Sequence, residues 1–163
     1  MALSATTRRL LDIQGFDRVD DRTLAQIQVW LRVAPALCGI VAAVGTALSS
    51  PPILWSLAAV AALGAVLPSH PFDLIYSIGV RWLTGGPTLP ANGPPRRFAC
   101  ALAAAWLLVT GALFAAGIDV AAYLLGGALA ATAALVATTH LCIPSIMFRA
   151  ACGQLPSQRE NRV

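Results

Sequence analysis

Long stretches without a single charge constrain this chain more than any other feature of its sequence. No charged residue occurs between Arg32 and Asp73, between Arg97 and Asp119, or between Asp119 and Arg149. Each gap approaches or exceeds the roughly 20 apolar residues that a membrane-spanning helix needs. Of all residues, 58% are hydrophobic and only 11% are charged, whereas about 25% are charged in a typical soluble domain. We therefore expect an integral membrane protein.

Turn signals divide the uncharged stretches into four predicted spans. The first stretch is interrupted by Ser49-Ser50-Pro51-Pro52, a sequence typical of a turn between two helices. We place the spans at about 33–49, 52–68, 97–116 and 120–142. They are rich in Ala, Gly, Ser and Thr, which allows helices to approach closely. The expected fold is all-α, an integral membrane four-helix bundle.

The positions of the arginines predict the topology. All 11 basic residues are arginines, and they precede the first span, lie between the second and third, or follow the fourth. Because basic residues near helix ends stay on the cytoplasmic side, both termini are expected in the cytoplasm. Residues 1–22 would form a polar cytoplasmic segment, 23–152 the four-span membrane domain and 153–163 a cytoplasmic tail. This placement explains the net charge of +4, so no nucleic-acid partner is expected.

Two shorter segments border the predicted spans on the cytoplasmic side. Asp21 is the predicted N-cap of a helix that leads into the first span. After the second span, Pro71 starts another helix in which Asp73 is placed to cap exposed amides. This segment puts Ile78 and Trp82 on one side, which predicts a cytoplasmic interfacial helix between spans two and three. The abundance of alanine and the absence of lysine indicate a GC-rich bacterial genome, and hence the bacterial cytoplasmic (inner) membrane.

The reactive residue types fall on one side of this topology. Cys38, His70, Cys100, His140 and Cys142 all belong to the cytoplasmic half of the predicted bundle. With helices about 8 to 10 Å apart, these side chains could meet in one layer near the cytoplasmic headgroups. A cytosolic location argues against structural disulfides, which leaves a metal, redox or sulfur-carrying role. The alternative is packing, because cysteine is often a small apolar filler in helices.

The stretch HLCIPS, residues 140–145, ends the last span in an unusual way. Pro144 has no amide hydrogen, so the carbonyl of His140 loses its helical partner and becomes a free acceptor beside Cys142. At the C-terminus of the long helix the dipole would disfavour a thiolate, whereas at the start of a short helix begun by Pro144 it would favour one. Arg96 or Arg97 could add positive potential. The hypothesis is that Cys142 is a reactive monothiol with His140 as its neighbour.

The candidate site residues follow from this clustering. The catalytic candidates are Cys142, Cys100 and His140. The binding candidates are His70, Asp73, Arg96, Arg97 and Ser145. The chain has no C-x-x-C pair, so no zinc signature exists and we expect neither a metal site nor a cofactor. Ligation of haem or a metal by His70 and His140 is an alternative that rests only on their shared depth.

Three stretches resemble a known family: HPFDLIY (70–76), PPRRFAC (94–100) and THLCIPS (139–145). They are similar to the bacterial membrane family called domain of unknown function 4395, over most of the chain from Leu11 to Gly153. The resemblance implies a small multi-helix inner-membrane protein and supplies no catalytic assignment. It also implies that some members have a second cysteine where this chain has Ser145. A dithiol cycle through that pair would then be absent here, and Cys100 or Cys152 would be the resolving thiol.

Three classes of function remain open at this point. The first is thiol chemistry at the cytoplasmic leaflet, either redox or relay of sulfur from a soluble sulfurtransferase or thioredoxin-like partner. The second is a structural or accessory membrane subunit without catalysis. The third is a small permease working as a homo-oligomer. Proton-coupled transport is disfavoured, because no ionisable side chain lies deep within the predicted spans.

Overall fold

The computed structural model describes residues 3–152, and the regular structure of this part of the chain is entirely helical. Three helical segments are long and apolar enough to cross a membrane, namely Trp30–Ala47, Pro94–Ala115 and Asp119–Thr139. A fourth apolar helix, Pro51–Val66, has 16 residues and is shorter. The predictions of an all-α fold and of helices able to span a membrane are therefore confirmed.

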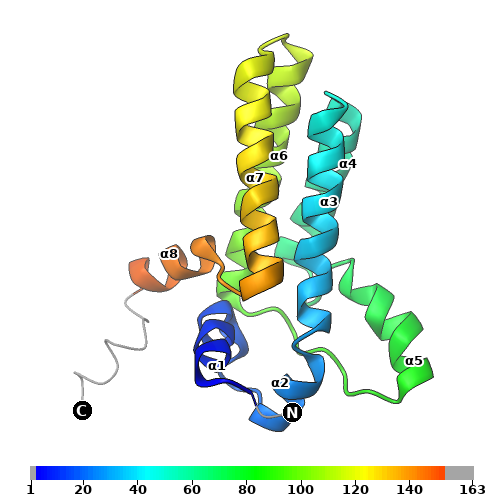
Figure 1. The fold of residues 1–163 in the computed structure, drawn as a ribbon, viewed down its shortest axis with the longest axis vertical. Helices are drawn as coiled ribbons and strands as arrows, with labels where there is room; N and C mark the ends of the chain where they lie inside the picture. Colours follow the sequence, from blue (N-terminus) through cyan, green and yellow to red (C-terminus); the bar gives the residue numbers. More distant parts are fainter. Residues whose placement is uncertain (1–2, 153–163) are drawn as a thin grey trace.

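Two long helical hairpins form the elongated body of the molecule (Figure 1). They consist of α3 (Val33–Ala47) with α4 (Pro51–Val66), and of α6 (Pro94–Ala115) with α7 (Asp119–Thr139). Helix α4 packs along α6, and α3 packs along α7. The four helices therefore share one interior, built from parts of the sequence far apart along the chain.

Small side chains let these helices approach closely. The core that they share consists mainly of alanine and leucine: Ala42, Leu54, Leu57, Ala58, Ala61, Ala104, Leu107, Phe114 and Ala122. Where α3 crosses α7, a Cβ atom on Gly126 would lie 2.2 Å from Thr46 Oγ1. The two helices can therefore pack this closely only because Gly126 has no side chain. Large apolar side chains on the outer surfaces of the hairpins, such as Val66 and Leu124, remain exposed.

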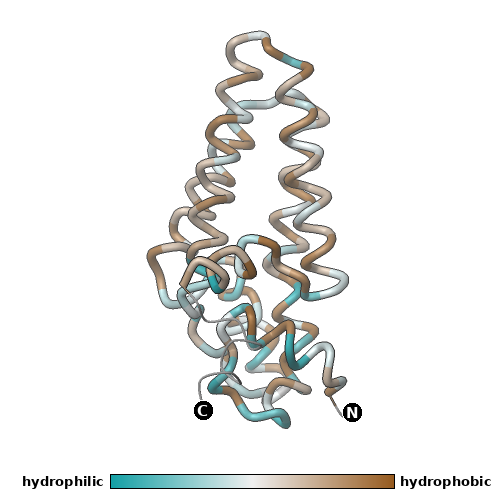
Figure 2. Tube along the Cα trace, turned by 90° about the vertical axis from the view of Figure 1, so that its left-hand side faces the viewer, coloured by the Kyte–Doolittle hydropathy of each residue, from teal (hydrophilic) through white to brown (hydrophobic). Residues whose placement is uncertain are grey.

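The N-terminal segment folds into short helices at one end of the hairpins. They are α1 (Ala5–Leu11), the π-helical turn η1 (Asp12–Phe16), α2 (Asp21–Ile27) and the short 3₁₀ helix η2 (Trp30–Arg32). A second small core of Leu11, Phe16, Leu24, Ile27 and Leu31 holds them together. Figure 2 shows that hydrophilic residues concentrate at this end of the molecule, which we call the polar end.

One detail of this segment corrects the sequence-based prediction. The N-cap of α2 is Asp20, whose carboxylate accepts a 2.9 Å hydrogen bond from the amide of Thr23, and Asp21 is already inside the helix. This hydrogen bond lowers the pKa of Asp20 below its ordinary value. Asp20 and Asp21 are adjacent aspartates, so the sequence alone does not show which one is the N-cap. The structure identifies Asp20, because its backbone is extended.

The remaining short helices also lie at the polar end (Figure 1). They are η3 (Ile75–Val80) and α5 (Arg81–Thr84), between the hairpins, and α8 (Ile143–Ala151), after the second hairpin. The side chains of Ile78 and Trp82 are exposed. Asp73 accepts a 3.3 Å hydrogen bond from the amide of His70 and so caps the turn that begins this segment.

The break between α7 and α8 explains how HLCIPS is used. Helix α7 ends at Thr139, before the predicted limit at 142, because His140 adopts a left-handed conformation with φ 62°. Cys142 is extended and is the N-cap of α8, and Pro144 lies in the first turn of that helix. Of the two placements considered for Cys142, the structure therefore has the one at the start of the short helix.

Candidate functional site

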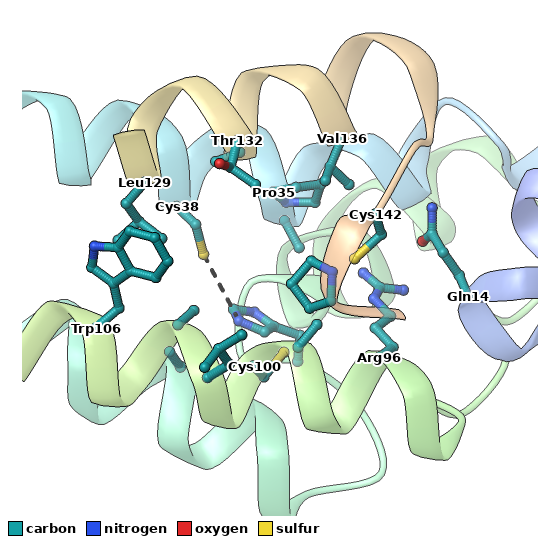
Figure 3. Close-up of a pocket in the computed structure, with 18 of the residues that line it drawn as sticks. Gln14, Pro35, Cys38, Arg96, Cys100, Trp106, Leu129, Thr132, Val136 and Cys142 are labelled. Carbon is teal, nitrogen blue, oxygen red and sulfur yellow. Dashed lines mark hydrogen bonds between the residues drawn. The ribbon is translucent and has the colours of Figure 1, made fainter. Parts of the chain in front are cut away.

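A pocket of about 160 Å³ lies between the two hairpins near the polar end. Its walls are mostly apolar side chains of α3, α6 and α7, such as Leu129 and Val136. The polar or reactive side chains among its lining residues are those of Gln14, Cys38, His70, Arg96, Cys100, Trp106, Thr132 and Cys142. Figure 3 shows this arrangement, with three cysteines and Arg96 around one cavity. Four of the residues predicted as a layer, all except His140, thus line the same pocket.

His70 is buried in this pocket in a defined tautomer. Its Nδ1 atom accepts a 3.2 Å hydrogen bond from the amide of Phe72. Burial, reinforced by the Arg96 guanidinium, lowers the pKa of His70 from 6.5 to about 4. The ring is therefore neutral at pH 7, and with Nδ1 acting as acceptor its proton lies on Nε2. That atom is 3.9 Å from Cys38 Sγ, so His70 donates a weak hydrogen bond to this sulfur (Figure 3).

The ring of His70 fits only because α4 has a glycine opposite it. A Cβ atom on Gly64 would lie 2.4 Å from Cδ2 of His70. Gly64 is in the last turn of α4, and His70 follows in the loop after that helix. The short connection therefore folds the imidazole back against its own helix and into the pocket.

Arg96 is a buried cation that lines the same pocket. It lies in the first turn of α6, and only 8% of its surface is exposed. Its guanidinium forms an ion pair with Asp73, at 3.7 Å from Nη2 to Oδ1, and stacks over the ring of Phe16 at 5.6 Å. Atom Nη1 has no hydrogen-bond partner among the described residues. Arg96 and Asp73, predicted as binding residues, are thus brought together.

Cys142 and Ser145 form a second contact at the pocket. The hydroxyl of Ser145 lies 3.1 Å from Cys142 Sγ and 3.3 Å from the carbonyl oxygen of Pro95, and its single proton can be donated to either. Ser145 is fully buried and occupies the first turn of α8, whose N-cap is Cys142. The sulfur therefore lies within reach of a hydroxyl donor and at the positive end of a helix dipole.

His140 is close to this site in sequence but has other partners. Its Nε2 atom accepts a 2.8 Å hydrogen bond from Nε of Arg32, and its carbonyl accepts one of 2.6 Å from Gln14. Burial, together with the charges of Arg32 and Arg96, lowers the pKa of His140 to about 4. The structure does not place its side chain among the residues that line the pocket.

Two further candidates have positions outside the pocket. Arg97 donates hydrogen bonds to the carbonyl oxygens of Ala65 and Val66 and so caps the C-terminus of α4. Cys152 is exposed at the end of α8, whereas Cys100 lines the pocket together with Cys142. Of the two resolving thiols considered, Cys100 is therefore the one that shares a cavity with Cys142.

Sequence reasoning missed two residues that hold the polar end together. Gln14 is buried and lines the pocket from η1. Arg149 of α8 is also buried and donates hydrogen bonds to the carbonyl oxygens of Ile13 and Asp12, at 2.9 and 2.5 Å. Both bind partners more than 120 residues away in sequence, so no local pattern could reveal them.

The chemistry of the donor set limits what this site can hold. Among the described residues, no group of three or more His, Cys, Asp or Glu side chains is arranged to hold a metal ion. The pocket instead combines three thiols, a neutral imidazole and one guanidinium. Such a set suits nucleophilic sulfur chemistry, in which a thiolate attacks and a fixed cation stabilises negative charge.

The fold and the pocket define a small all-α protein that has helices long and apolar enough to cross a membrane and three thiols around one pocket. The chain belongs to the family described as Domain of unknown function (DUF4395), whose model matches residues 28–152. The matched region includes every residue that lines the pocket except Gln14. No curated protein and no solved structure matches the chain.

Proposed function

We propose that α3, α4, α6 and α7 all cross the bacterial inner membrane, with the polar end in the cytoplasm. All described arginines lie before α3, between α4 and α6, in the first turn of α6, or in α8. The turns at the opposite end of the two hairpins contain none. This distribution supports a cytoplasmic location of the polar end. The exposed apolar side chains of Ile75, Ile78, Trp82 and Leu83 support placing η3 and α5 on the cytoplasmic leaflet.

The proposed activity is thiol chemistry at Cys142. The observation that carries it is the position of this cysteine at the N-cap of α8, with the Ser145 hydroxyl 3.1 Å from its sulfur. Both features are typical of the surroundings of nucleophilic cysteines. The sulfur also lines a pocket that holds a second thiol, Cys100. A cysteine that only fills space needs neither a hydroxyl donor nor a helix N-terminus.

The reaction class follows from these groups. The Cys142 thiolate attacks one sulfur of a disulfide, forms a mixed disulfide and expels the other sulfur as a thiolate. When it attacks the outer sulfur of a persulfide, that sulfur atom is transferred to Cys142, and the donor cysteine leaves as a thiolate. Ser145 occupies the position where a neighbouring thiol could close a local disulfide. Cys100 is therefore the proposed resolving thiol, and a soluble thioredoxin-like or sulfurtransferase protein is the proposed partner.

Thiol labelling tests this proposal. In reconstituted vesicles, a variant that retains only Cys142 would be compared with one that retains only Cys152, using a small alkylating reagent. We expect Cys142 to react faster although it is far less exposed, and Ser145→Ala to slow it by about two- to tenfold, the range for loss of one hydrogen bond. Slower reaction of Cys142 than of Cys152, unchanged by Ser145→Ala, would contradict the proposal.

A structural or accessory subunit is the second candidate function. It is favoured by the contacts of Arg97, which cap α4, and of Arg149, which bind the N-terminal segment. Both arginines, which the topology prediction places in the cytoplasm, thus have structural contacts: one caps a helix and the other holds two segments together. If the protein is a structural subunit, the Cys142→Ser variant should fully complement a deletion strain. If Cys142 carries out thiol chemistry, this variant should not complement it.

A further inference from the structure

The guanidinium of Arg96 retains unused capacity to bind an anion. Its Nη1 atom is buried and has no hydrogen-bond partner among the described residues. Its ion pair with Asp73 is loose, because 3.7 Å exceeds the roughly 2.7 to 2.9 Å of a charge-assisted hydrogen bond. Asp73 Oδ1 also has no hydrogen-bond donor among the residues that the structure describes. A buried cation that is not fully paired is costly, so the site favours an additional negative group.

The surroundings of Arg96 suit a small anion. Figure 3 shows its guanidinium pointing toward Cys142, and both residues line the pocket. No Asp or Glu is among the described residues that line this cavity. The first turn of α8, which begins after Cys142, adds the positive end of a helix dipole. The imidazole of His70 is neutral and adds no charge to the pocket.

The size of the pocket limits the ligand. A cavity of about 150 Å³ accommodates benzene, which has six heavy atoms, and this pocket measures about 160 Å³. It therefore admits an anion of about five heavy atoms. Cys142 is only 8% exposed, and Gln14 lines the pocket from the N-terminal segment.

We propose that the pocket binds a small sulfur oxyanion with a transferable outer sulfur, of the thiosulfate type. Arg96 is the anion-binding residue, and Cys142 is the sulfur acceptor. This inference deepens the proposed function and rests on it, since it names a substrate class for the same thiol. In the absence of the oxyanion, Arg96 forms a loose ion pair with Asp73. The bound oxyanion displaces this carboxylate.

The chemical step is a displacement at sulfur. The Cys142 thiolate attacks the outer sulfur of thiosulfate, and a sulfur–sulfur bond forms as the bond to the sulfonate sulfur breaks. The electron pair of the broken bond leaves with sulfite, while Cys142 becomes a persulfide anion. The total charge is the same before and after the step, and no external oxidant or reductant is required. Arg96 stabilises the negative charge on the sulfonate oxygens as sulfite departs.

Two measurements on the full-length protein in vesicles test this inference. The first is sulfite release after addition of thiosulfate, together with the gain of one sulfur atom on Cys142 detected by mass spectrometry. The second is protection of Cys142 from alkylation by sulfate, an anion of similar size that has no transferable sulfur. The variants are Arg96→Gln, Asp73→Asn and the control Arg22→Gln, which makes the same charge change at an exposed position of the polar end.

We expect Arg96→Gln to slow sulfite release and to weaken sulfate protection by about 10- to 100-fold, the range for a hydrogen bond to a charged group. Arg22→Gln should leave both unchanged. Asp73→Asn removes the competing carboxylate and should give protection at a lower sulfate concentration. This variant keeps the test decisive if Arg96→Gln fails to fold.

The outcomes separate this inference from the proposed function. Rapid alkylation of Cys142 without sulfite release would overturn the thiosulfate-type substrate and leave the thiol proposal intact. Sulfite release or sulfate protection that is equal in wild type, Arg96→Gln and Asp73→Asn would overturn the role of Arg96. Slow alkylation of Cys142 by every reagent would overturn the proposed function and the inference with it.

Discussion

Gln14 and His140 are 126 residues apart in sequence, yet Gln14 Nε2 donates a 2.6 Å hydrogen bond to the carbonyl oxygen of His140. The proline in HLCIPS leaves this carbonyl without the amide of residue 144 as a helical partner, and η1 supplies the donor instead. The end of α7 and the N-terminal segment are therefore stabilised together. The segment also closes one side of the pocket, because Gln14 lines it.

Loss of this hydrogen bond should destabilise the protein. Gln14→Leu leaves a buried carbonyl unpaired, which costs about 1 to 3 kcal/mol of unfolding free energy. We expect a lower thermal unfolding midpoint, followed by tryptophan fluorescence of the purified protein. Gln26→Leu is the matched control, since Gln26 is an exposed residue of α2. Equal shifts for the two variants would show that the contact contributes nothing.

Arg149 should control how tightly the N-terminal segment is held. Its guanidinium donates to the carbonyl oxygens of Asp12 and Ile13 and forms an ion pair with Asp17 at 3.7 Å. Arg149→Met removes these contacts, so local opening of the segment becomes more frequent. Trypsin cleavage after Arg18 should then accelerate by about tenfold or more, the equivalent of losing one hydrogen bond to a charged group.

The control for this experiment is Arg9→Met, because Arg9 is exposed on α1. Arg9 lies in the N-terminal segment, as the cleavage site does, and its replacement by Met removes the same charge as Arg149→Met. Cleavage after Arg18 at an equal rate in both variants would mean that α8 does not hold the N-terminal segment. Cleavage at a wild-type rate in Arg149→Met would mean that the small core of Leu11, Phe16 and Leu24 is sufficient.

The sequence allowed the apolar helices to be located but not the fold of the N-terminal segment. Charge-free stretches and turn residues such as Pro51 define helices by local chemistry alone. In the segment before α2, Gly15 has φ 106° and interrupts the helical period, so its apolar residues show no regular spacing. A Cβ atom on Gly15 would lie 3.1 Å from Cα of Gly93, so the close approach of a segment distant in sequence also favours glycine at this position.

The sequence predicted most of the residues in the candidate site but not which of them contact one another. Topology alone placed Cys38, His70, Cys100 and Cys142 at one depth, and all four line the pocket. The same reasoning grouped His140 with them, whereas its side chain is held by Arg32. Depth follows from position along a helix, but the direction of a side chain depends on the rotation of that helix. That rotation is fixed by packing between distant segments.

The close contact between Gly64 and His70 should be sensitive to a single methyl group. A Cβ atom on Gly64 would be 2.4 Å from the His70 ring, so Gly64→Ala must displace the imidazole from the pocket. Overpacking of this kind typically costs about 1 to 3 kcal/mol. We expect a lower thermal midpoint and faster alkylation of Cys38, which loses its hydrogen-bond donor and its cover. Gly127→Ala is the control, because a Cβ atom there meets nothing within 4 Å.

Stability should fall on mild acidification because of the two histidines. The folded-state pKa of both His70 and His140 is lowered from 6.5 to about 4, in each case chiefly by burial. Between these two values the unfolded chain binds more protons than the folded chain, so unfolding is favoured as the pH falls. The contribution is fully present above pH 6.5 and is lost progressively toward pH 4. We expect a lower thermal midpoint at pH 5 than at pH 7.

Replacement of the two histidines identifies the source of this effect. The double variant His70→Gln and His140→Gln keeps a polar side chain at each position, and Gln can still accept the hydrogen bond from Arg32. Its thermal midpoint should change little between pH 7 and pH 5. The pKa of Asp12 is raised by burial, so this carboxyl acts in the opposite direction and stabilises the folded state as the pH falls. A double variant that loses as much stability as the wild type would assign the pH dependence to other groups.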